Sequence, residues 1–227
     1  NLRKKIFYFK PMSLEIRKKQ AENTIFQGNR KLKLVVPCQN ERGKDELIYK
    51  EHMAYKLFEK VSDVHLRTQP LTLKIIEKKG NKEIEHTMFA FLIEDDNKVA
   101  KRHDIKKFAK RRVSPLIVKD SSAINFAMFS YMIGNTDWSM AYQHNVEMFF
   151  DGRRLVAIPY DFDHSGLVDA FYAKPNPMLK ISSVTERVYR GLCKRDAETF
   201  TTMRDFYRSK ESEIFSVIDS YKENLSE

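Results

Sequence analysis

Two carboxylates and one side-chain amide in the middle of the chain have the residue types and order of a metal-and-phosphate site. Asp137 closes the segment 134–137, Asn145 follows eight residues later, and Asp161 ends the segment 158–161. A loop Asp, a loop Asn and a further Asp after a hairpin can hold Mg²⁺ and a phosphate tail beside a catalytic base. We therefore expect Asp137 to orient or deprotonate a hydroxyl group.

Mg²⁺ takes hard oxygen ligands and shares itself with phosphates, so Asn145 and Asp161 are candidate metal ligands. Asp163 is a third candidate, because it lies two residues beyond Asp161 on the same face of an extended chain. His144 and His164 flank these acids without matching a metal-binding spacing. We expect the two histidines to be hydrogen-bond partners of the aspartates.

Lys33 and Glu51 form a second candidate pair. Lys33 lies on a predicted strand at 32–37, and Glu51 falls within the apolar stripe of a predicted helix at 45–61. An ionised Glu on such a stripe is costly unless it is paired, and Lys33 is a plausible partner. Lys31 points to the same face of the strand and competes with it. Alternatively, Glu51 lies at the edge of the stripe and reaches water.

The elements around the acids are short and well marked. An apolar helix is predicted at 123–133, and Gly134 suits its C′ position. Strands at 145–150 and 154–160 flank Asp151-Gly152, a strong type I′ hairpin signal. The hairpin brings its first and last residues, and with them the amide and the second acid, to the same end.

The remaining patterns predict an α+β protein of two lobes with a cleft between them. Residues 1–97 would form a small β-rich lobe with one key helix at 45–61. Residues 98–227 would form a larger, mainly helical lobe carrying the loop 134–145 and the hairpin 145–161. The other predicted elements are strands at 71–77 and 85–94 and helices near 196–208 and 211–224.

The segment Gly134-Asn135-Thr136-Asp137 followed by His144-Asn145, with Pro159-Tyr160-Asp161 after the hairpin, resembles the catalytic loop and metal segment of atypical kinase-like folds. CotH spore-coat protein kinases and HipA toxin kinases exemplify this family, and a group of bacterial proteins in the same superfamily is also similar. The resemblance implies a catalytic Asp137, the metal ligands Asn145 and Asp161, the ion pair Lys33–Glu51, and ATP with Mg²⁺ as cofactors. It further implies a hydroxyl acceptor on a protein or small molecule.

Three departures favour a catalytically inactive pseudokinase or binding module as the alternative. Asp137 and Asn145 are eight positions apart, whereas the protein-kinase pattern places them five apart. Trp138 stands where the relatives often carry a basic residue. No Gly-rich loop is present, with Gly28 the sole candidate near Lys33. Asp161-Phe162-Asp163 could also be a DxD metal site of a non-kinase enzyme, but such a site normally belongs to an α/β sheet rather than a hairpin.

The composition is that of a globular protein. With 227 residues, 42% hydrophobic and 32% charged, the chain can bury a full core as one domain or two lobes, and we expect a monomer. No apolar run approaches the length of a transmembrane helix. The chain opens at Asn1 rather than Met, which favours removal of an upstream segment and a periplasmic or secreted location, with a cytoplasmic location as the alternative.

The net charge of +10 favours an anionic partner. Much of the excess lies between Lys98 and Arg112, where basic residues face a single acid, Asp104. A nucleic-acid binder is a further alternative, although no DNA-reading motif is visible. Cys38 and Cys193 have no metal-type spacing, so they are either two free thiols or one long-range disulfide.

Overall fold

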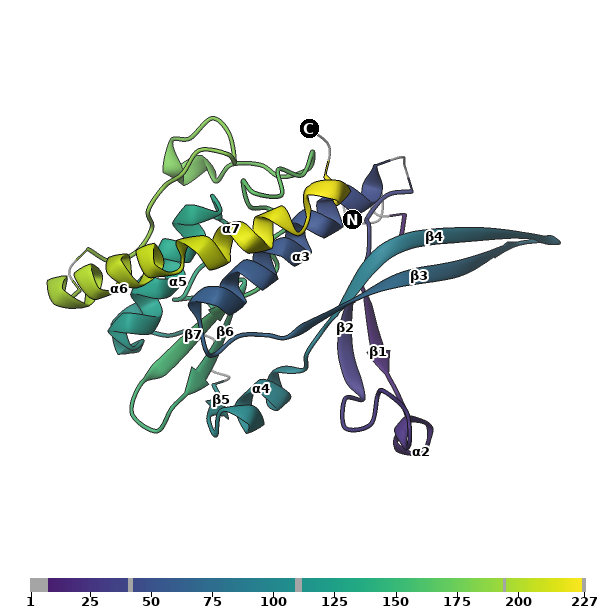
Figure 1. Cartoon of the computed structure of the whole chain (residues 1–227), viewed down its shortest axis with the longest axis horizontal. Helices are drawn as coiled ribbons and strands as arrows, with labels where there is room; N and C mark the ends of the chain where they lie inside the picture. The colour runs from purple at the N-terminus through teal and green to yellow at the C-terminus, as the bar shows by residue number, and fades with distance from the viewer. Residues whose placement is uncertain (1–7, 41–42, 109–111, 194, 226–227) are drawn as a thin grey trace.

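The computed structural model describes residues 8–40, 43–108, 112–193 and 195–225. It is a mixed structure of helices and antiparallel strands (Figure 1), which confirms the α+β part of the predicted fold class. Its larger sheet has the strand order β1-β2-β4-β3 and is antiparallel throughout. The strands are β1 (Met12–Glu15), β2 (Lys31–Val35), β3 (Thr68–Lys79) and β4 (Lys82–Ile93).

The strands β3 and β4 form a long hairpin that projects beyond β1 and β2 (Figure 1). Both strands are longer than predicted, because the register continues without interruption from Thr68↔Ile93 to Lys79↔Lys82. Gly80 makes the turn at φ +60°, a conformation that glycine adopts without steric cost. The short helix α2 (Lys18–Ala21) lies in the connection between β1 and β2.

Helix α3 (Lys44–Val61) matches the predicted helix to within one residue at its start. It packs against β4 on one side and against α7 (Glu211–Asp219) on another. Nine of its residues are buried, among them Glu51 and His52. A helix that buries polar side chains together with its apolar face lies between other elements rather than on the surface.

A second sheet has the order β5-β6-β7 and contains the predicted hairpin. Its strands are β5 (Lys106–Lys107), β6 (Val146–Phe150) and β7 (Leu155–Pro159). The predicted type I′ turn is wrong. A loop of four residues, 151–154, joins β6 to β7, and the Asp151 carboxylate accepts the backbone N–H groups of Arg153 and Arg154 at 2.9 and 2.8 Å. The loop is therefore stabilised by hydrogen bonds to the Asp151 side chain, which a two-residue turn would not form.

The other helices are α4 (Asp96–Arg102), α5 (Asp120–Met132) and α6 (Ala197–Ser209), with short 3₁₀ turns at Pro115–Ile117, Pro177–Leu179 and Lys222–Asn224. Two of these helices, α4 and α5, contact this second sheet, and α6 packs against α5. Helix α5 begins three residues earlier than predicted. Gly134 has φ +66° directly after the C-cap residue Ile133, so the predicted C′ position is confirmed. No helix in the described part of the chain is long and apolar enough to cross a membrane.

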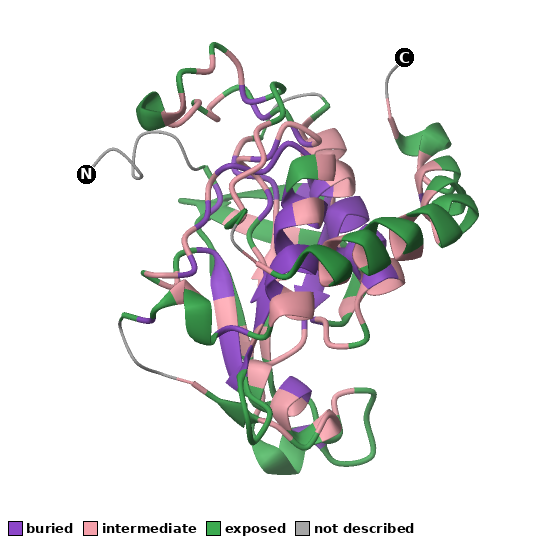
Figure 2. Cartoon of the chain, turned by 90° about the vertical axis from the view of Figure 1, so that its left-hand side faces the viewer, coloured by how far each residue is buried: buried purple, intermediate pink, exposed green. Residues whose placement is uncertain are grey.

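One hydrophobic core joins both sheets. Its buried residues come from α3, β4, α4, α5, β6, β7 and α7, and Figure 2 shows buried residues gathered at the centre of the molecule. Phe162 is 0% exposed, and its ring lies 4.7 Å from that of Tyr55 on α3 and 5.8 Å from that of Phe129 on α5. The expected boundary at residue 97 falls inside α4, and the core crosses it.

Candidate functional site

Asp137 is held in place by the turn that follows α5. Asn135 is buried, and its side-chain oxygen accepts the backbone N–H of Asp137 at 3.0 Å. The backbone carbonyl of Asn135 accepts the indole N–H of Trp138 at 3.1 Å. Trp138 packs against Phe126 in a second buried cluster. A packed indole and an internal hydrogen bond therefore fix the backbone on both sides of Asp137.

The structure brings Asp137 and Asn145 into direct contact. The Nδ2 group of Asn145 donates to the backbone oxygen of Asp137 at 2.8 Å and to its Oδ2 at 3.1 Å. Both acceptors lack hydrogens to donate, so the amide nitrogen must face Asp137 and the amide oxygen must face away from it. His144 Nε2 lies 3.0 Å from Oδ1 of Asp137, as expected for a histidine partner. The Asp137 side chain is still 40% exposed, so its carboxylate can reach a substrate.

Asn145 and Asp161 lie at the same end of the β6–β7 hairpin, as predicted. The backbone N–H of Tyr160 donates to the Asn145 carbonyl at 3.3 Å, and that of Asp161 donates to the buried Tyr55 hydroxyl at 3.0 Å. Asn145 has φ +51° and Asp161 has φ +62°. Left-handed backbone at non-glycine residues costs free energy and is concentrated at functional sites.

Two of the aspartates have a raised pKa. Burial of its carboxyl raises the pKa of Asp161 to about 6, although the residue as a whole is exposed, and the charges of Asp163 and Asp137 add to this effect. The charges of His164 and Lys33 oppose it. Burial also raises the pKa of Asp163, whose Oδ2 accepts the Tyr172 hydroxyl at 3.1 Å and lies 3.9 Å from His164 Nε2. The site thus concentrates negative charge beyond what its own cations balance.

Glu51 belongs to this group of acids rather than to an ion pair. Its side chain is buried, at 4% exposure, and its carboxyl accepts the backbone N–H of Phe162. Burial raises its pKa well above the ordinary value, and the charges of Asp163 and Asp161 raise it further. The alternative that Glu51 reaches water is therefore wrong as well. A buried carboxyl beside two others favours the protonated form.

The expected ion pair of Lys33 with Glu51 does not form in the described structure. Lys33 Nζ lies 3.9 Å from Oε1 of Glu147 and 4.7 Å from the centre of the Tyr160 ring. Lys31, the competing lysine, pairs with the exposed Glu15. Lys33 is nevertheless close enough to Asp161 for its charge to lower the pKa of that carboxyl. The lysine therefore faces the site from the larger sheet, but with a different partner.

Glu147 is a residue of the site that the sequence reasoning missed. It lies on β6, and Lys107 Nζ approaches its Oε2 to 3.4 Å while also contacting Asp96. Glu147 thereby joins Lys33 of one sheet to Lys107 of the other. The available signal was the alternation along β6, where Val146 and Met148 are buried and the residue between them points to the opposite face.

Arg190 is the second missed residue. Its Nη1 group donates to the backbone oxygens of Thr136 and Trp138 at 2.5 and 2.9 Å, and its guanidinium lies 4.9 Å from the centre of the Trp138 ring. A cation therefore lies beside Asp137 although Trp138 itself is part of the core. No periodic pattern marks the irregular segment that carries Arg190.

The basic segment is partly neutralised within the molecule. Arg102 pairs with Glu94 at 2.8 Å and donates to the carbonyl of His65, while Lys107 pairs with two acids. Lys110 and Arg111 lie outside the described residues. Cys38 and Cys193 are free thiols, which resolves the two alternatives for the cysteines.

Within the described ranges, no group of three or more His, Cys, Asp or Glu side chains is placed to hold a metal ion. The oxygen atoms that could hold one together with other ligands are those of Asp161, Asp163 and the Asn145 amide. Mg²⁺ commonly takes one or two carboxylates and leaves other positions to phosphate and water. The chain matches no family model, no curated protein and no solved structure.

Proposed function

We propose that this protein is a kinase-like phosphotransferase that binds ATP with Mg²⁺ and transfers phosphate to a hydroxyl group. The observation that carries the proposal is the convergence of Asp137, Asn145 and Asp161 at one end of the β6–β7 hairpin. Burial raises the pKa of Asp161, and the charges of Asp163 and Asp137 raise it further, so a divalent cation at this position would relieve the repulsion.

On this proposal the larger elements are arranged as in CotH and HipA kinases. Lys33 of the larger sheet is near enough to lower the pKa of Asp161, and α3 packs against both β4 and α7. On this proposal the two parts are the lobes of a kinase-like fold, and the candidate site lies where they meet.

The roles of the residues follow from their contacts. Bound Mg²⁺ would neutralise phosphate charge, with Asp161, Asp163 and the Asn145 oxygen as its protein ligands. Asp137 accepts the proton of the acceptor hydroxyl, because its carboxylate is 40% exposed and is oriented by His144 and Asn145. Lys33 would contact phosphate with its ammonium group, which is 3.9 Å from Glu147 and retains further donors for a second anion.

A nucleotide-binding pseudokinase is the second candidate. It is favoured by the partner of Lys33, which is Glu147 rather than Glu51, and by the protonated state that burial favours at Glu51. Binding without turnover would result if Lys33 stays on Glu147 after nucleotide has bound.

Calorimetry with Mg-ATP and a coupled assay of ATP consumption test the proposal together. We expect wild type to bind Mg-ATP, Asp161→Asn to lose that binding by at least tenfold, and Asp137→Asn to bind but turn over at least a hundredfold more slowly. Asp63→Asn is the matched control, because Asp63 is exposed and lies outside the site.

The outcomes separate the candidates. Binding by wild type with ATP consumption no faster than that of Asp137→Asn would establish the pseudokinase. Absence of Mg-ATP binding by wild type would contradict both.

A further inference from the structure

The loop that joins β6 to β7 lies among cations that have no internal partner. Arg153 and Arg154 are exposed in this loop, Lys106 is exposed on the neighbouring strand β5, and Lys119 is exposed directly before α5. Figure 1 shows the loop at the lower left of the molecule, beside β5. None of these four side chains forms an ion pair with an acid in the described part of the chain. A lysine at the start of a helix also opposes the helix dipole, so Lys119 does not stabilise α5.

The sheet register places these residues side by side. Lys106 pairs with Phe150 across β5 and β6, and Phe150 pairs with Leu155 across β6 and β7. Leu155 in turn forms a bridge with Val118, and its carbonyl accepts the backbone N–H of Lys119 at 2.8 Å. Because adjacent strands lie about 4.8 Å apart, this row of paired residues spans roughly 15 Å. The cations therefore lie together at one end of the second sheet, which we call the loop end.

The acids closest to the loop end in the chain are already bonded. Asp151 is the only acid of the loop, and hydrogen bonds from two backbone N–H groups lower its pKa, which the charge of Lys119 lowers further. Asp120 is bonded to Arg195, whose side chain is 4% exposed. The loop end therefore keeps an excess of positive charge at the surface.

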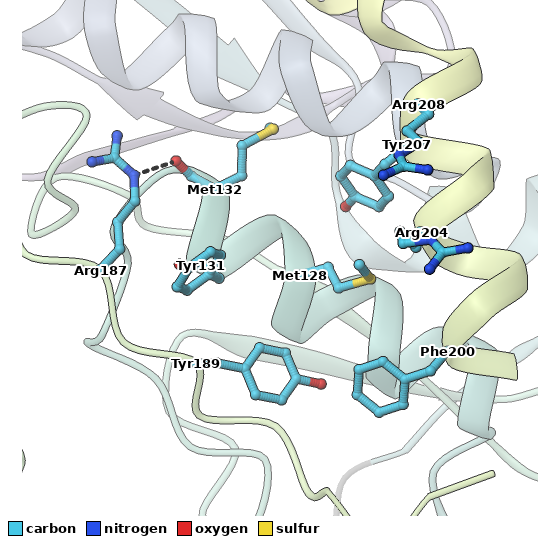
Figure 3. Close-up of a pocket in the computed structure, with 9 residues that line it drawn as sticks. All are labelled: Met128, Tyr131, Met132, Arg187, Tyr189, Phe200, Arg204, Tyr207 and Arg208. Atoms are coloured by element: carbon cyan, nitrogen blue, oxygen red, sulfur yellow. Dashed lines mark hydrogen bonds between the residues drawn. The ribbon is translucent and has the colours of Figure 1, made fainter. Parts of the chain in front are cut away.

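Cations elsewhere on the surface are at least partly neutralised within the molecule. Figure 3 shows Arg187 donating to the Met132 carbonyl, at 3.1 Å, beside the groove between α5 and α6. Arg204 of the same groove pairs with Asp205 at 2.9 Å. The four cations of the loop end have no such contacts, so they remain available to an anionic partner.

Exposed apolar side chains accompany these cations. Leu116, Ile117 and Phe150 are 64%, 48% and 38% exposed. The first two belong to the 3₁₀ turn Pro115–Ile117, whose first carbonyl accepts a hydrogen bond from the buried Arg195 side chain at 2.5 Å. The turn is thus held from its inner side, while its two aliphatic side chains remain at the surface.

Cations beside exposed aliphatic side chains fit a lipid surface better than a nucleic acid. Lys and Arg gain free energy from the negative potential of an anionic membrane, and apolar side chains gain it by entering the boundary between headgroups and acyl chains. Single-stranded nucleic acids also supply negative charge, but their bases are held by aromatic stacking, which Leu116 and Ile117 cannot provide.

From the unpaired cations and the apolar side chains among them, we propose that the loop end docks on an anionic lipid membrane. The four cations contact the phosphate groups of the lipids, and the three apolar side chains enter the interface. Asn145 and Asp161 lie at the opposite end of the same hairpin, about 17 Å away along strands of five residues. Docking at the loop end therefore leaves the candidate site accessible.

Co-sedimentation with large unilamellar vesicles tests the proposal. We expect binding to vesicles of phosphatidylglycerol and phosphatidylcholine in equal parts, weakening as salt is added, and no binding to phosphatidylcholine alone. Each basic residue near an anionic surface contributes about fivefold in affinity, so Arg153→Gln combined with Arg154→Gln should weaken binding about 25-fold. Leu116→Asn should weaken it about fivefold without a change of charge, because its apolar surface no longer leaves water.

Lys78→Gln combined with Lys82→Gln is the matched control. It removes the same charge from the tip of the β3–β4 hairpin, at the far right of Figure 1. This variant should bind the anionic vesicles to within about twofold of wild type, because the tip lies beyond the screening length from the loop end.

Four results would overturn the proposal. They are no binding of wild type to the anionic vesicles, equal weakening by the two double variants, wild-type binding by Leu116→Asn, and tighter binding of wild type to polyuridylic acid than to the vesicles at the same salt concentration. The last result would indicate a nucleic-acid surface instead. None of these outcomes depends on nucleotide binding.

Discussion

The buried acidic side chains of the candidate site are unfavourable in their ionised form. Glu51, Asp161 and Asp163 each have a raised pKa, with burial as the largest cause and neighbouring carboxylates among the others. Each of these acids binds a proton more tightly in the folded than in the unfolded chain. Their contribution to stability is therefore complete below the unfolded pKa and is lost as the pH rises toward the folded pKa. A cation bound among these carboxylates would offset this loss of stability.

Replacing Glu51 with glutamine tests this at the buried member of the group. Gln resembles the protonated carboxyl, so we expect Glu51→Gln to match wild type near pH 4 and to exceed it by about 1–3 kcal/mol near pH 7, without Mg²⁺. Urea unfolding across this range measures the difference, with the exposed Glu223→Gln as control. A variant less stable than wild type at pH 7 would instead indicate an ionised, paired Glu51.

At the scale of elements, the loop 134–145 is held by hydrogen bonds from segments that lie later in the chain. Arg190 holds the two carbonyls on either side of Asp137 and stacks on Trp138, while Gly166 donates its backbone N–H to Gly134 at 3.1 Å. The segment after Asp161 thus returns to the turn that positions Asp137. The same segment therefore contacts the surroundings of both acids.

Arg190→Met should release the loop, since the hydrophobic stem is kept and the donors are lost. We expect a loss of about 2–3 kcal/mol of stability, because hydrogen bonds from a charged donor contribute about 1.5–3 kcal/mol. Faster amide hydrogen exchange at Asp137 and Trp138 would report the local release. Arg190→Lys should recover part of the loss through its single ammonium group, and equal stability of the Met variant and wild type would argue against a fastening role.

At the scale of the whole molecule, one core links the larger sheet to the helical part. Phe162 lies at the junction between α3 and α5, directly beside the acids. Because both parts contribute residues to this core, we expect unfolding of one part to expose core residues of the other. We infer that the relative position of Lys33 and the acids depends on the same core.

Unfolding of the molecule should therefore be a single cooperative transition. Trp138, the only tryptophan, lies in the second buried cluster and reports on the helical part by fluorescence, while far-UV circular dichroism reports on the whole chain. We expect the two midpoints to coincide and Phe162→Ala to lower stability by about 3–5 kcal/mol. Separate transitions would mean that the parts before and after residue 97 fold independently.

The sequence alone determined the local features. Apolar runs, Gly134 and Asp151-Gly152 predict the end of α5 and the hairpin, because helix caps and turns depend on neighbouring residues. Asn145 and Asp161 could be placed together for the same reason, as the hairpin itself joins its two ends. The type of turn was wrong, because the side chain of Asp151 supplied hydrogen bonds that the dipeptide pattern does not show.

The tertiary structure decided which distant residues meet. Glu51 was correctly assigned to a helix, but its neighbours are Asp161 and Asp163 rather than Lys33, whose partner is Glu147. Arg190 reaches the loop from more than fifty residues away. Periodicity tells which face of an element is buried, but not which element covers that face. That choice depends on the packing of the whole core, which no short stretch of sequence contains.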